Sequence, residues 1–457
     1  MSALVACAPH PAERNPSFAS HPPIEIVETY PIETGLGHPE TRETLPVWLE
    51  FIDGARTSLD LEQFYVSTWP GEALEPVLDA IGRAAERGVA VRLLIDAAMY
   101  RTYPQPADSL GGLRGIELRV IDYRKITGGV QHSKLMIADR AELFVGSQNF
   151  DWRALSHIHE LGVVVRDARV AGAVAEMFDM DWEAAGSGEG TSSADKHDAA
   201  PGAATPSAAT PSAATPSGAT ASDTTAGDAS AGPEGTGDPG AIRPDSATWD
   251  VALSPGDAAK IHVSASPPSR QAALANDLET LVGLIDEAEL EIVAQMLSYS
   301  VSARGLEETA LDDALRRAAA RGVHVSLLVS DWQADSESRT EVVKRLSAVP
   351  GIDVGMSVVP DYSGGYIPFA RVEHCKFLVA DTEVAWVGTS NWGPDYFASS
   401  RNVGVTIEHE GIAATLRETF ARSWNASTTV HVQPDGNYRS RTHREEAPAG
   451  ERIYGGR

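Results

Sequence analysis

The hydrophobic pattern of the first third of the chain alternates between short apolar runs and longer segments with a helical apolar stripe. Residues 23–30 alternate apolar and polar side chains, which predicts a strand, and the stripe over 44–55 predicts a helix. The run at 89–95 is almost entirely apolar, as is typical of a strand covered on both faces. Further strands are predicted at 58–66, 116–121, 143–145 and 161–165, and further helices at 74–87 and up to about 185. This alternation predicts a layered α/β unit.

The pattern stops at a long stretch of low complexity. Residues 186–245 consist mainly of Ala, Thr, Pro, Ser, Gly and Asp, and Ala-Ala-Thr-Pro-Ser occurs three times between Ala203 and Ser217. Such a segment buries too little apolar surface to offset its chain entropy, which predicts a disordered linker. Residues 1–24 and 431–457 are also polar, and we expect loosely ordered tails there.

After the linker the first half begins again. Residues 51–55 (Phe-Ile-Asp-Gly-Ala) are echoed by 284–288 (Leu-Ile-Asp-Glu-Ala), and the aromatic pair Phe178 and Trp182 recurs as Phe420 and Trp424. The period is far longer than that of a solenoid repeat. We therefore predict two copies of one α/β unit, over 25–185 and 246–430, related by a pseudo-twofold axis.

A polar motif recurs with the same offset. It reads His-x-Lys, four residues, Asp, six residues, Gly-(Ser/Thr)-x-Asn, and it occupies 132–149 and 374–391. The candidate site residues in the two copies are His132, Lys134, Asp139, Ser147 and Asn149, and His374, Lys376, Asp381, Thr389 and Asn391. A repeat of residue types at identical spacing argues against a merely structural role for either histidine.

The chemistry of this set suits attack on a phosphodiester. If each motif starts as a strand, His and Lys share one face because strand side chains alternate. Two lysines and two asparagines can hold the non-bridging oxygens and stabilise transition-state charge. One neutral histidine can attack phosphorus to form a phosphohistidine, while the other donates a proton to the leaving oxygen and then activates water.

Other residues of the motif are expected to support the site from outside it. Strand parity places Asp139 and Asp381 away from the lysines, which favours a salt-bridge or turn-capping role. The same parity turns Cys375 away from the pocket, so we interpret it as a small buried filler.

Two further candidates stand 28 residues after the histidines. Glu160 follows His132 at this distance, and Asn402 follows His374. A carboxylate bound to a catalytic imidazole fixes its tautomer and raises its basicity. We therefore expect Glu160 to pair with His132, which would make His132 the nucleophile and His374 the acid.

Composition narrows the possible partners. The chain carries 64 Asp and Glu against 37 Lys and Arg, a net charge of −27, which predicts a solvated acidic surface and excludes a large basic face for duplex nucleic acid. Two of its six lysines lie in the repeated motif. The two cysteines cannot form a metal cluster or a disulfide framework. The sequence contains no run of 18 apolar residues, so we predict no membrane span. We expect a monomer or a weak dimer.

The sequence near the N-terminus leaves the location open. Residues 4–7 (Leu-Val-Ala-Cys) look like the lipidation box of a bacterial lipoprotein, but only three residues precede them. If the true start lies upstream, we expect a lipid anchor on Cys7 and an extracytoplasmic protein; otherwise the resemblance is chance and the protein is cytoplasmic.

The motif pair resembles the signature of the phospholipase D superfamily. Residues 125–132, 149–153, 160–164 and 367–374 further resemble the subgroup of animal phospholipases D three and D four and a poxvirus envelope phospholipase. The resemblance implies two α/β/α sandwiches with one active site at their interface and no metal cofactor in the chemistry. It also implies a single-stranded nucleic acid substrate, since the animal members look like 5′ exonucleases.

We therefore expect a phosphodiester hydrolase that acts without a metal, with single-stranded DNA or RNA as the leading substrate. Phospholipid hydrolysis or headgroup exchange is the alternative, and an inactive phosphodiester-binding module is a third possibility. Whether cleavage is exo- or endonucleolytic stays open. A nuclease needs aromatic platforms for base stacking, and the candidates are Trp152, Tyr299, Trp332, Trp392 and Tyr396, each of which could instead belong to the core.

Overall fold

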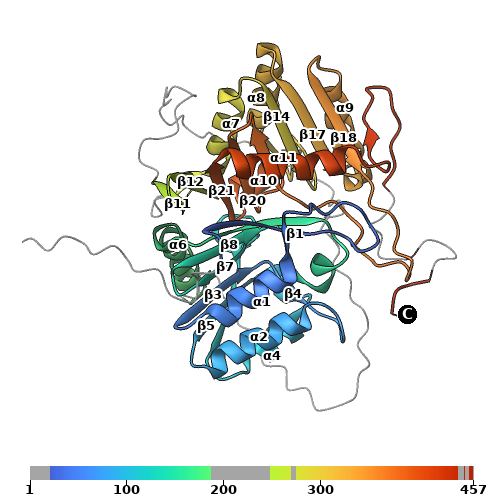
Figure 1. Ribbon diagram of the computed structural model, residues 1–457. Helices are drawn as coiled ribbons and strands as arrows, with labels where there is room; N and C mark the ends of the chain where they lie inside the picture. Colours follow the sequence, from blue (N-terminus) through green and yellow to red (C-terminus); the bar gives the residue numbers. More distant parts are fainter. Residues whose placement is uncertain (1–20, 187–246, 269–273, 441–446, 448–451, 456–457) are drawn as a thin grey trace, which may run out of the picture.

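Two α/β units lie one above the other in the computed structural model (Figure 1). The structure describes residues 21–186, 247–268, 274–440, 447 and 452–455. Most of the predicted N-terminal tail and all but the first residue of the predicted linker therefore lie outside the described residues.

The first unit is built on a mixed eight-stranded sheet. Its strands are β1 (Ile24–Thr29), β2 (Arg42–Glu43), β3 (Ser58–Gln63), β5 (Ala90–Asp96), β6 (Ile116–Ile121), β7 (Lys134–Ala138), β8 (Glu142–Gly146) and β10 (Glu160–Val165). The spatial order is β2-β1-β10-β8-β7-β3-β5-β6. The strands β3, β5 and β6 are parallel, and β7, β8, β10 and β1 continue the sheet antiparallel. Separately, β4 (Val66–Ser67) pairs with β9 (Phe150–Asp151).

The second unit repeats this topology. Its strands are β11 (Thr248–Ser254), β12 (Asp257–Ser266), β13 (Ala275–Asn276), β14 (Glu291–Met296), β17 (His324–Ser330), β18 (Ile352–Ser357), β19 (Phe377–Ala380), β20 (Val384–Gly388), β21 (Asn402–Glu408) and β22 (Val430–His431). The order is β11-β12-β21-β20-β19-β14-β17-β18-β22, with β13 beside β12. The core from β12 to β18 matches that from β1 to β6, which confirms the predicted duplicated α/β fold.

Helices cover both faces of each sheet. In the first unit α1 (Thr44–Gly54) and α2 (Glu75–Glu86) pack on one face, and α6 (Ala168–Gly186) packs on the other. Their counterparts are α7 (Asp277–Glu287), α8 (Ala310–Arg321) and α11 (Glu410–Trp424). The remaining helical segments are α3 (Ala97–Tyr100), α4 (Pro104–Gly111), α5 (Tyr123–Ile126), η2 (Trp152–Leu155), η3 (Asp331–Asp335), α9 (Glu337–Ser347) and α10 (Pro394–Ala398).

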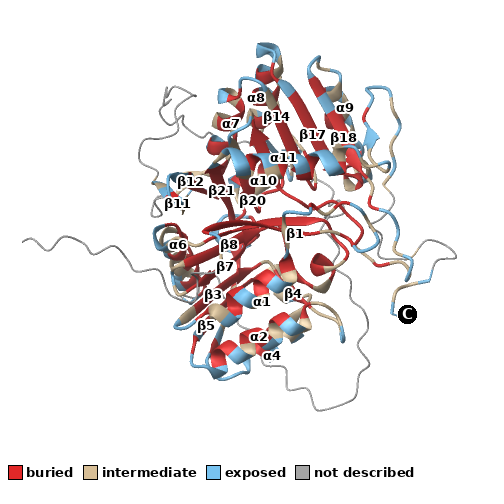
Figure 2. Ribbon diagram, viewed as in Figure 1, coloured by how far each residue is buried: buried red, intermediate tan, exposed pale blue. Residues whose placement is uncertain are grey.

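The duplication extends to single side chains. Phe178 and Trp182 on α6 stack with their ring centroids 5.7 Å apart, and Phe420 and Trp424 on α11 stack at 5.2 Å. These helices contribute to a hydrophobic core that is continuous between the units, and Figure 2 shows the buried strands on both sides of the junction. The shared core holds the two sheets as one body and fixes the ends of their motif strands relative to each other.

Backbone pairing across the junction places the two motifs together. Gln131 forms an isolated parallel bridge with Arg401, and His159 forms one with Glu373. The regular strands start later, β7 at Lys134 and β19 at Phe377, so the motif histidines lie outside the strands that we predicted would carry them. The reason is that each histidine segment leaves its own sheet to pair with the opposite unit.

The C-terminal part of the chain differs from the loose tail that the sequence predicts. The strand β22 pairs antiparallel with β18, and Ile453 forms a bridge with Tyr366. The second unit thus extends beyond residue 430. None of the helices in the described ranges is both long and apolar enough to cross a membrane.

Candidate active site

The four basic side chains of the two motifs form one buried cluster. Lys134 and Lys376 are fully buried, and both histidines are less than a tenth exposed. Burial, followed by the charges of both lysines, lowers the pKa of His132 and of His374 well below the ordinary value. Each histidine therefore experiences the lysine of the opposite unit as well as its own, so the predicted residues form one site.

Each imidazole binds a partner from the opposite unit through Nδ1. His132 Nδ1 lies 2.9 Å from Oδ1 of Asn402, and His374 Nδ1 lies 2.7 Å from Oε2 of Glu160. The expected pairing of Glu160 with His132 is wrong. His159 is bridged to Glu373, and its carbonyl accepts the His374 N–H at 2.9 Å, so the next residue, Glu160, reaches the second motif.

The partners determine where the ring protons lie. The Asn402 amide nitrogen donates to the carbonyl oxygens of Tyr396 and Ser400 at 3.0 and 3.2 Å, which turns Oδ1 toward His132. His132 Nδ1 must therefore carry a proton. Burial raises the pKa of Glu160, while the charges of Lys376 and Lys134 oppose that shift. With Glu160 as the carboxylate, His374 Nδ1 carries a proton as well. The Nε2 atoms are left as the atoms available for chemistry.

The lysines are oriented by their own motif backbones. Lys134 Nζ donates to the carbonyl of His132 at 2.6 Å, and Lys376 Nζ donates to that of His374 at 2.8 Å. Burial lowers the pKa of Lys376 to about 8, although the Glu160 charge opposes the shift. Burial and the charge of Lys376 lower the pKa of Lys134 well below its ordinary value. An ammonium has three N–H donors, so two remain on each lysine for a ligand.

The end of each motif holds the strand that presents the histidine partner. Ser147 accepts the Leu161 N–H at 2.9 Å through Oγ, next to Glu160. Thr389 accepts the Val403 N–H at 3.0 Å and donates to Asn402 Oδ1 at 3.1 Å. The glycine before each hydroxyl residue leaves room for an aromatic ring: a Cβ on Gly388 would lie 2.3 Å from the Trp386 ring. The Gly-(Ser/Thr) step is thus explained by packing.

The motif asparagines differ from the other polar groups of the site. Asn149 and Asn391 are buried, and their Oδ1 atoms have no hydrogen-bond partner among the described residues. These two oxygens, unlike Oδ1 of Asn402, are thus left for a ligand.

The motif aspartates lie outside the pocket. The Asp139 carboxylate accepts the backbone N–H groups of residues 56–58 at 2.7 to 3.1 Å. Asp381 accepts those of residues 289–291 at 2.7 to 3.3 Å. Each carboxylate closes the turn between a helix and the strand that follows, which is the contact pattern of a turn cap.

Of the two motif histidines, His132 is the one that contacts aromatic rings in the described part of the chain. Phe64 and Tyr396 contact the His132 ring edge-on, with centroids 4.9 and 5.0 Å away. Phe64 was not among the predicted site residues, because it lies within the strand predicted over 58–66, whereas β3 ends at Gln63. Of the platform candidates, Tyr299 and Trp392 lie in the core of the second unit, which excludes them as base-stacking surfaces.

The other candidates are partly exposed. Trp152 stacks against Tyr454 at 5.9 Å, and Trp332 contacts Phe369 at 6.4 Å. A ring that already has a partner in the chain offers a nucleobase one face at most.

A buried cluster of His159, Glu28 and Glu373 connects the two units next to the site. His159 Nε2 lies 2.9 Å from Glu28 and Nδ1 lies 2.7 Å from Glu373, so both ring nitrogens face carboxylates. Burial alone lowers the pKa of His159, but Cys375 and Glu373 beside it raise that pKa well above the usual value. Cys375 is fully buried, as predicted for a filler, yet it borders this charged cluster. Protons on both ring nitrogens leave His159 no lone pair for a metal ion.

The site combines two His-Lys-Asn sets, one from each unit, and each imidazole contacts a residue of the opposite unit. Comparison with known proteins agrees: residues 48–182 and 281–424 match the family described as "Cardiolipin synthase, PLD-like domain". The chain belongs to this phospholipase D family of phosphodiester hydrolases, as its motifs predicted.

Individual relatives carry different names. The chain is 31% identical to phospholipase D Y of Dictyostelium discoideum over 428 residues, covering 90% of this chain and 92% of that one. It is 27% identical to the human 5′-3′ exonuclease PLD3 over 436 residues, covering 88% and 80%. The phosphatidylserine synthase structure from Haemophilus influenzae aligns with a TM-score of 0.54 at 9% identity, covering 90% and 87%, which concerns the fold alone.

Proposed function

We propose that this protein hydrolyses single-stranded nucleic acid from its 5′ end through a covalent phosphohistidine on His374. The observation that carries the mechanism is the unequal pairing of the two imidazoles. Attack by His374 Nε2 on phosphorus places positive charge on the ring, and the Glu160 carboxylate 2.7 Å from Nδ1 stabilises that charge. His132 has only the neutral Asn402 amide at Nδ1, so its protonated form is the stronger acid.

The reaction then has two steps, formation of the phosphohistidine and its hydrolysis. In the first, a bond forms between His374 Nε2 and phosphorus, the bond to the leaving oxygen breaks, and His132 gives that oxygen its Nε2 proton. In the second, water attacks phosphorus, His132 takes a proton from the water, and the phosphorus–nitrogen bond breaks. Lys134 and Lys376 hold the non-bridging oxygens throughout and supply positive charge for this chemistry without requiring a metal ion.

Substrate binding itself prepares the acid. In the free protein the burial and two lysine charges lower the pKa of His132. An anionic phosphodiester between the lysines offsets their charge and raises the pKa of His132 again. Bound substrate therefore favours the charged form of the acid.

Two observations favour nucleic acid over lipid. Relatives that align over most of the chain include 5′-3′ exonucleases. A lipid enzyme benefits from a continuous apolar rim, but the large apolar side chains that are exposed in the described part of the chain come from separate segments. They are Ile32, Leu113, Ile126, Leu290, Leu306 and Val430.

The test uses purified protein in EDTA with two substrates, a 5′-hydroxyl single-stranded DNA labelled at its 3′ end and phosphatidylcholine liposomes. We expect stepwise shortening of the DNA from the 5′ end, and no shortening by the His132→Ala and His374→Ala variants. Release of choline with intact DNA would assign the protein to phospholipid hydrolysis instead. Binding of the DNA without turnover of either substrate would identify an inactive binding module.

A further inference from the structure

A short segment connects the second motif to the ring of His132. The motif ends at Asn391, and α10 follows directly and carries Tyr396, whose ring lies 5.0 Å from that of His132. Burial raises the pKa of Tyr396, as does Asp395, while Asn391 and the charges of Arg304 and Arg339 lower it. The Tyr396 ring thus contacts His132, and the charges of two arginines outside the motifs act on its phenol.

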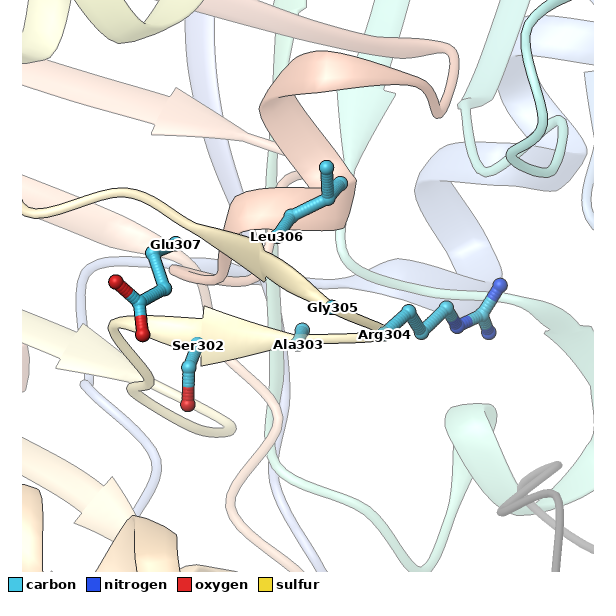
Figure 3. A pocket seen from close by; sticks show the side chains of 6 residues that line it. All are labelled: Ser302, Ala303, Arg304, Gly305, Leu306 and Glu307. Atoms are coloured by element: carbon cyan, nitrogen blue, oxygen red, sulfur yellow. The ribbon is translucent and has the colours of Figure 1, made fainter. Parts of the chain in front are cut away.

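Arg304 stands at the tip of a hairpin beside α10. The hairpin consists of β15 (Ser302–Ala303) and β16 (Leu306–Glu307), and its residues line a hollow of about 560 Å³. Figure 3 shows the Arg304 side chain extending from the tip, away from Ser302 and Glu307. Its Nε lies 3.3 Å from the Asp395 carboxylate, so one acidic group of α10 partly neutralises this charge.

Arg339 approaches Tyr396 from a different element, the first turn of α9. It donates to the Trp332 carbonyl at 3.1 Å, and the charge of Asp335 acts on it. Its buried Nε has no hydrogen-bond partner among the described residues. A guanidinium that is largely removed from water with an unused N–H is suited to bind an anion, particularly a phosphate.

We propose that Arg304 and Arg339 bind the phosphate next to the scissile one, on the leaving-group side of the site. This inference rests on the proposed nuclease function, in which His132 protonates the leaving oxygen. The strand that continues from this oxygen must pass the His132 side, where the Tyr396 ring contacts His132. Arg304 pairs with Asp395 next to Tyr396, and the charge of Arg339 acts on the Tyr396 phenol. A phospholipid has no second phosphodiester there, so the pair would select oligonucleotides.

The test compares thymidine dinucleotide, with one phosphodiester, and thymidine trinucleotide, with two. For Arg339→Gln and for the double variant with Arg304→Gln, we expect the ratio of kcat/KM for trinucleotide over dinucleotide to fall about tenfold, the effect of one charge-assisted hydrogen bond. Arg345→Gln removes an exposed charge from the same helix and should leave the ratio unchanged. Arg339→Lys should restore part of the ratio, because it keeps the charge without the planar fork.

If the double variant loses equal activity on both substrates, or none, the ratio stays unchanged. That result would overturn the second phosphate site while leaving the nuclease function in place. If the unaltered protein cleaves neither oligonucleotide but hydrolyses bis(p-nitrophenyl) phosphate, the nuclease function itself fails, and the second phosphate site fails with it.

Discussion

His374 Nδ1 lies 2.7 Å from Oε2 of Glu160, although 214 residues separate the two in the chain. The contact crosses the junction between the two units, and the corresponding contact of His132 with Asn402 crosses it in the opposite direction. Each half thus orients the reactive imidazole of the other half. One partner is a carboxylate and the other an amide, so the two histidines are chemically different despite the symmetry of their motifs.

Glu160→Gln should slow formation of the covalent intermediate about 10- to 100-fold, because an amide can still accept the Nδ1 proton but cannot stabilise charge on the phosphorylated ring. Rapid-quench kinetics on single-stranded DNA measures this step. Glu183→Gln, which changes an exposed carboxylate of α6, serves as the control and should have no effect. A change of less than twofold in Glu160→Gln would contradict the assigned role.

The reaction should be favoured by acidic pH. The pKa of His132 in the free protein lies well below 6.5, because burial and both lysines oppose its charge. The protonated acid therefore becomes scarcer as the pH rises above that pKa, and kcat/KM should fall from pH 5 to pH 8. If kcat/KM instead rises from pH 5 to pH 8, the protonated form of His132 is not the proton donor.

Asn402→Asp tests the role of His132 as the acid by changing the group that contacts its Nδ1 atom. A carboxylate at Nδ1 raises the pKa of His132, so the falling limb of the pH profile should move to higher pH by about one unit or more. The maximal rate should decrease, since a less acidic imidazolium donates its proton less readily. If the falling limb does not move, it reports the titration of a group other than His132.

Lys376→Met should make the protein more stable and inactive. Its pKa falls from 10.5 to about 8 on burial, so the folded state carries an unfavourable charge below pH 8. Between pH 8 and 10.5 the unfolded state binds more protons, and the stability of the unaltered protein should rise with pH. At pH 7 the variant should gain on the order of 2 kcal/mol in urea unfolding. Loss of stability would mean that the lysine charge is compensated in the fold.

Glu373→Gln should destabilise the junction by about 3 kcal/mol, because it leaves the buried His159 cation with one carboxylate in place of two. The pKa of Glu373 is lowered from 4.5, so its contribution is lost as pH falls; that of His159 is raised from 6.5, so its contribution is lost as pH rises. The difference in unfolding free energy should be largest between pH 4.5 and 6.5.

A matched surface pair provides the comparison for Glu373→Gln. Lys260 and Glu408 are 2.7 Å apart with side chains 48% and 43% exposed, so Glu408→Gln should change stability by less than about 0.5 kcal/mol. Equal effects of the two substitutions would show that the buried cluster contributes no more than a solvated ion pair.

Much of the architecture was predictable because the same sequence pattern occurs in both halves of the chain. The offset between the copies fixed the equivalence of His132 with His374, and apolar periodicity placed elements such as α1 and β5 within one or two residues. Strand parity also placed the Asp139 and Asp381 carboxylates away from the lysines, where they lie in the structure. These features depend on local spacing, which a sequence records directly.

The pairing across the junction was not predictable in the same way. Glu160 and Asn402 stand at equal distances from their own histidines, and spacing cannot tell whether a side chain reaches its own unit or the other one. That choice depends on the bridge of His159 with Glu373, a contact between distant segments. Burial of Tyr299 and Trp392 likewise depends on packing of the whole second unit.

The most direct test of the mechanism identifies the histidine that becomes phosphorylated. A p-nitrophenyl ester of thymidine 3′-phosphate has a leaving group that needs no proton, so the His132→Ala variant should release one equivalent of p-nitrophenol and then stop, since no base activates water. Alkaline quenching and peptide mapping should find the phosphate on His374, and His374→Ala should give no burst. A burst in His374→Ala with phosphate on His132 would reverse the assigned roles.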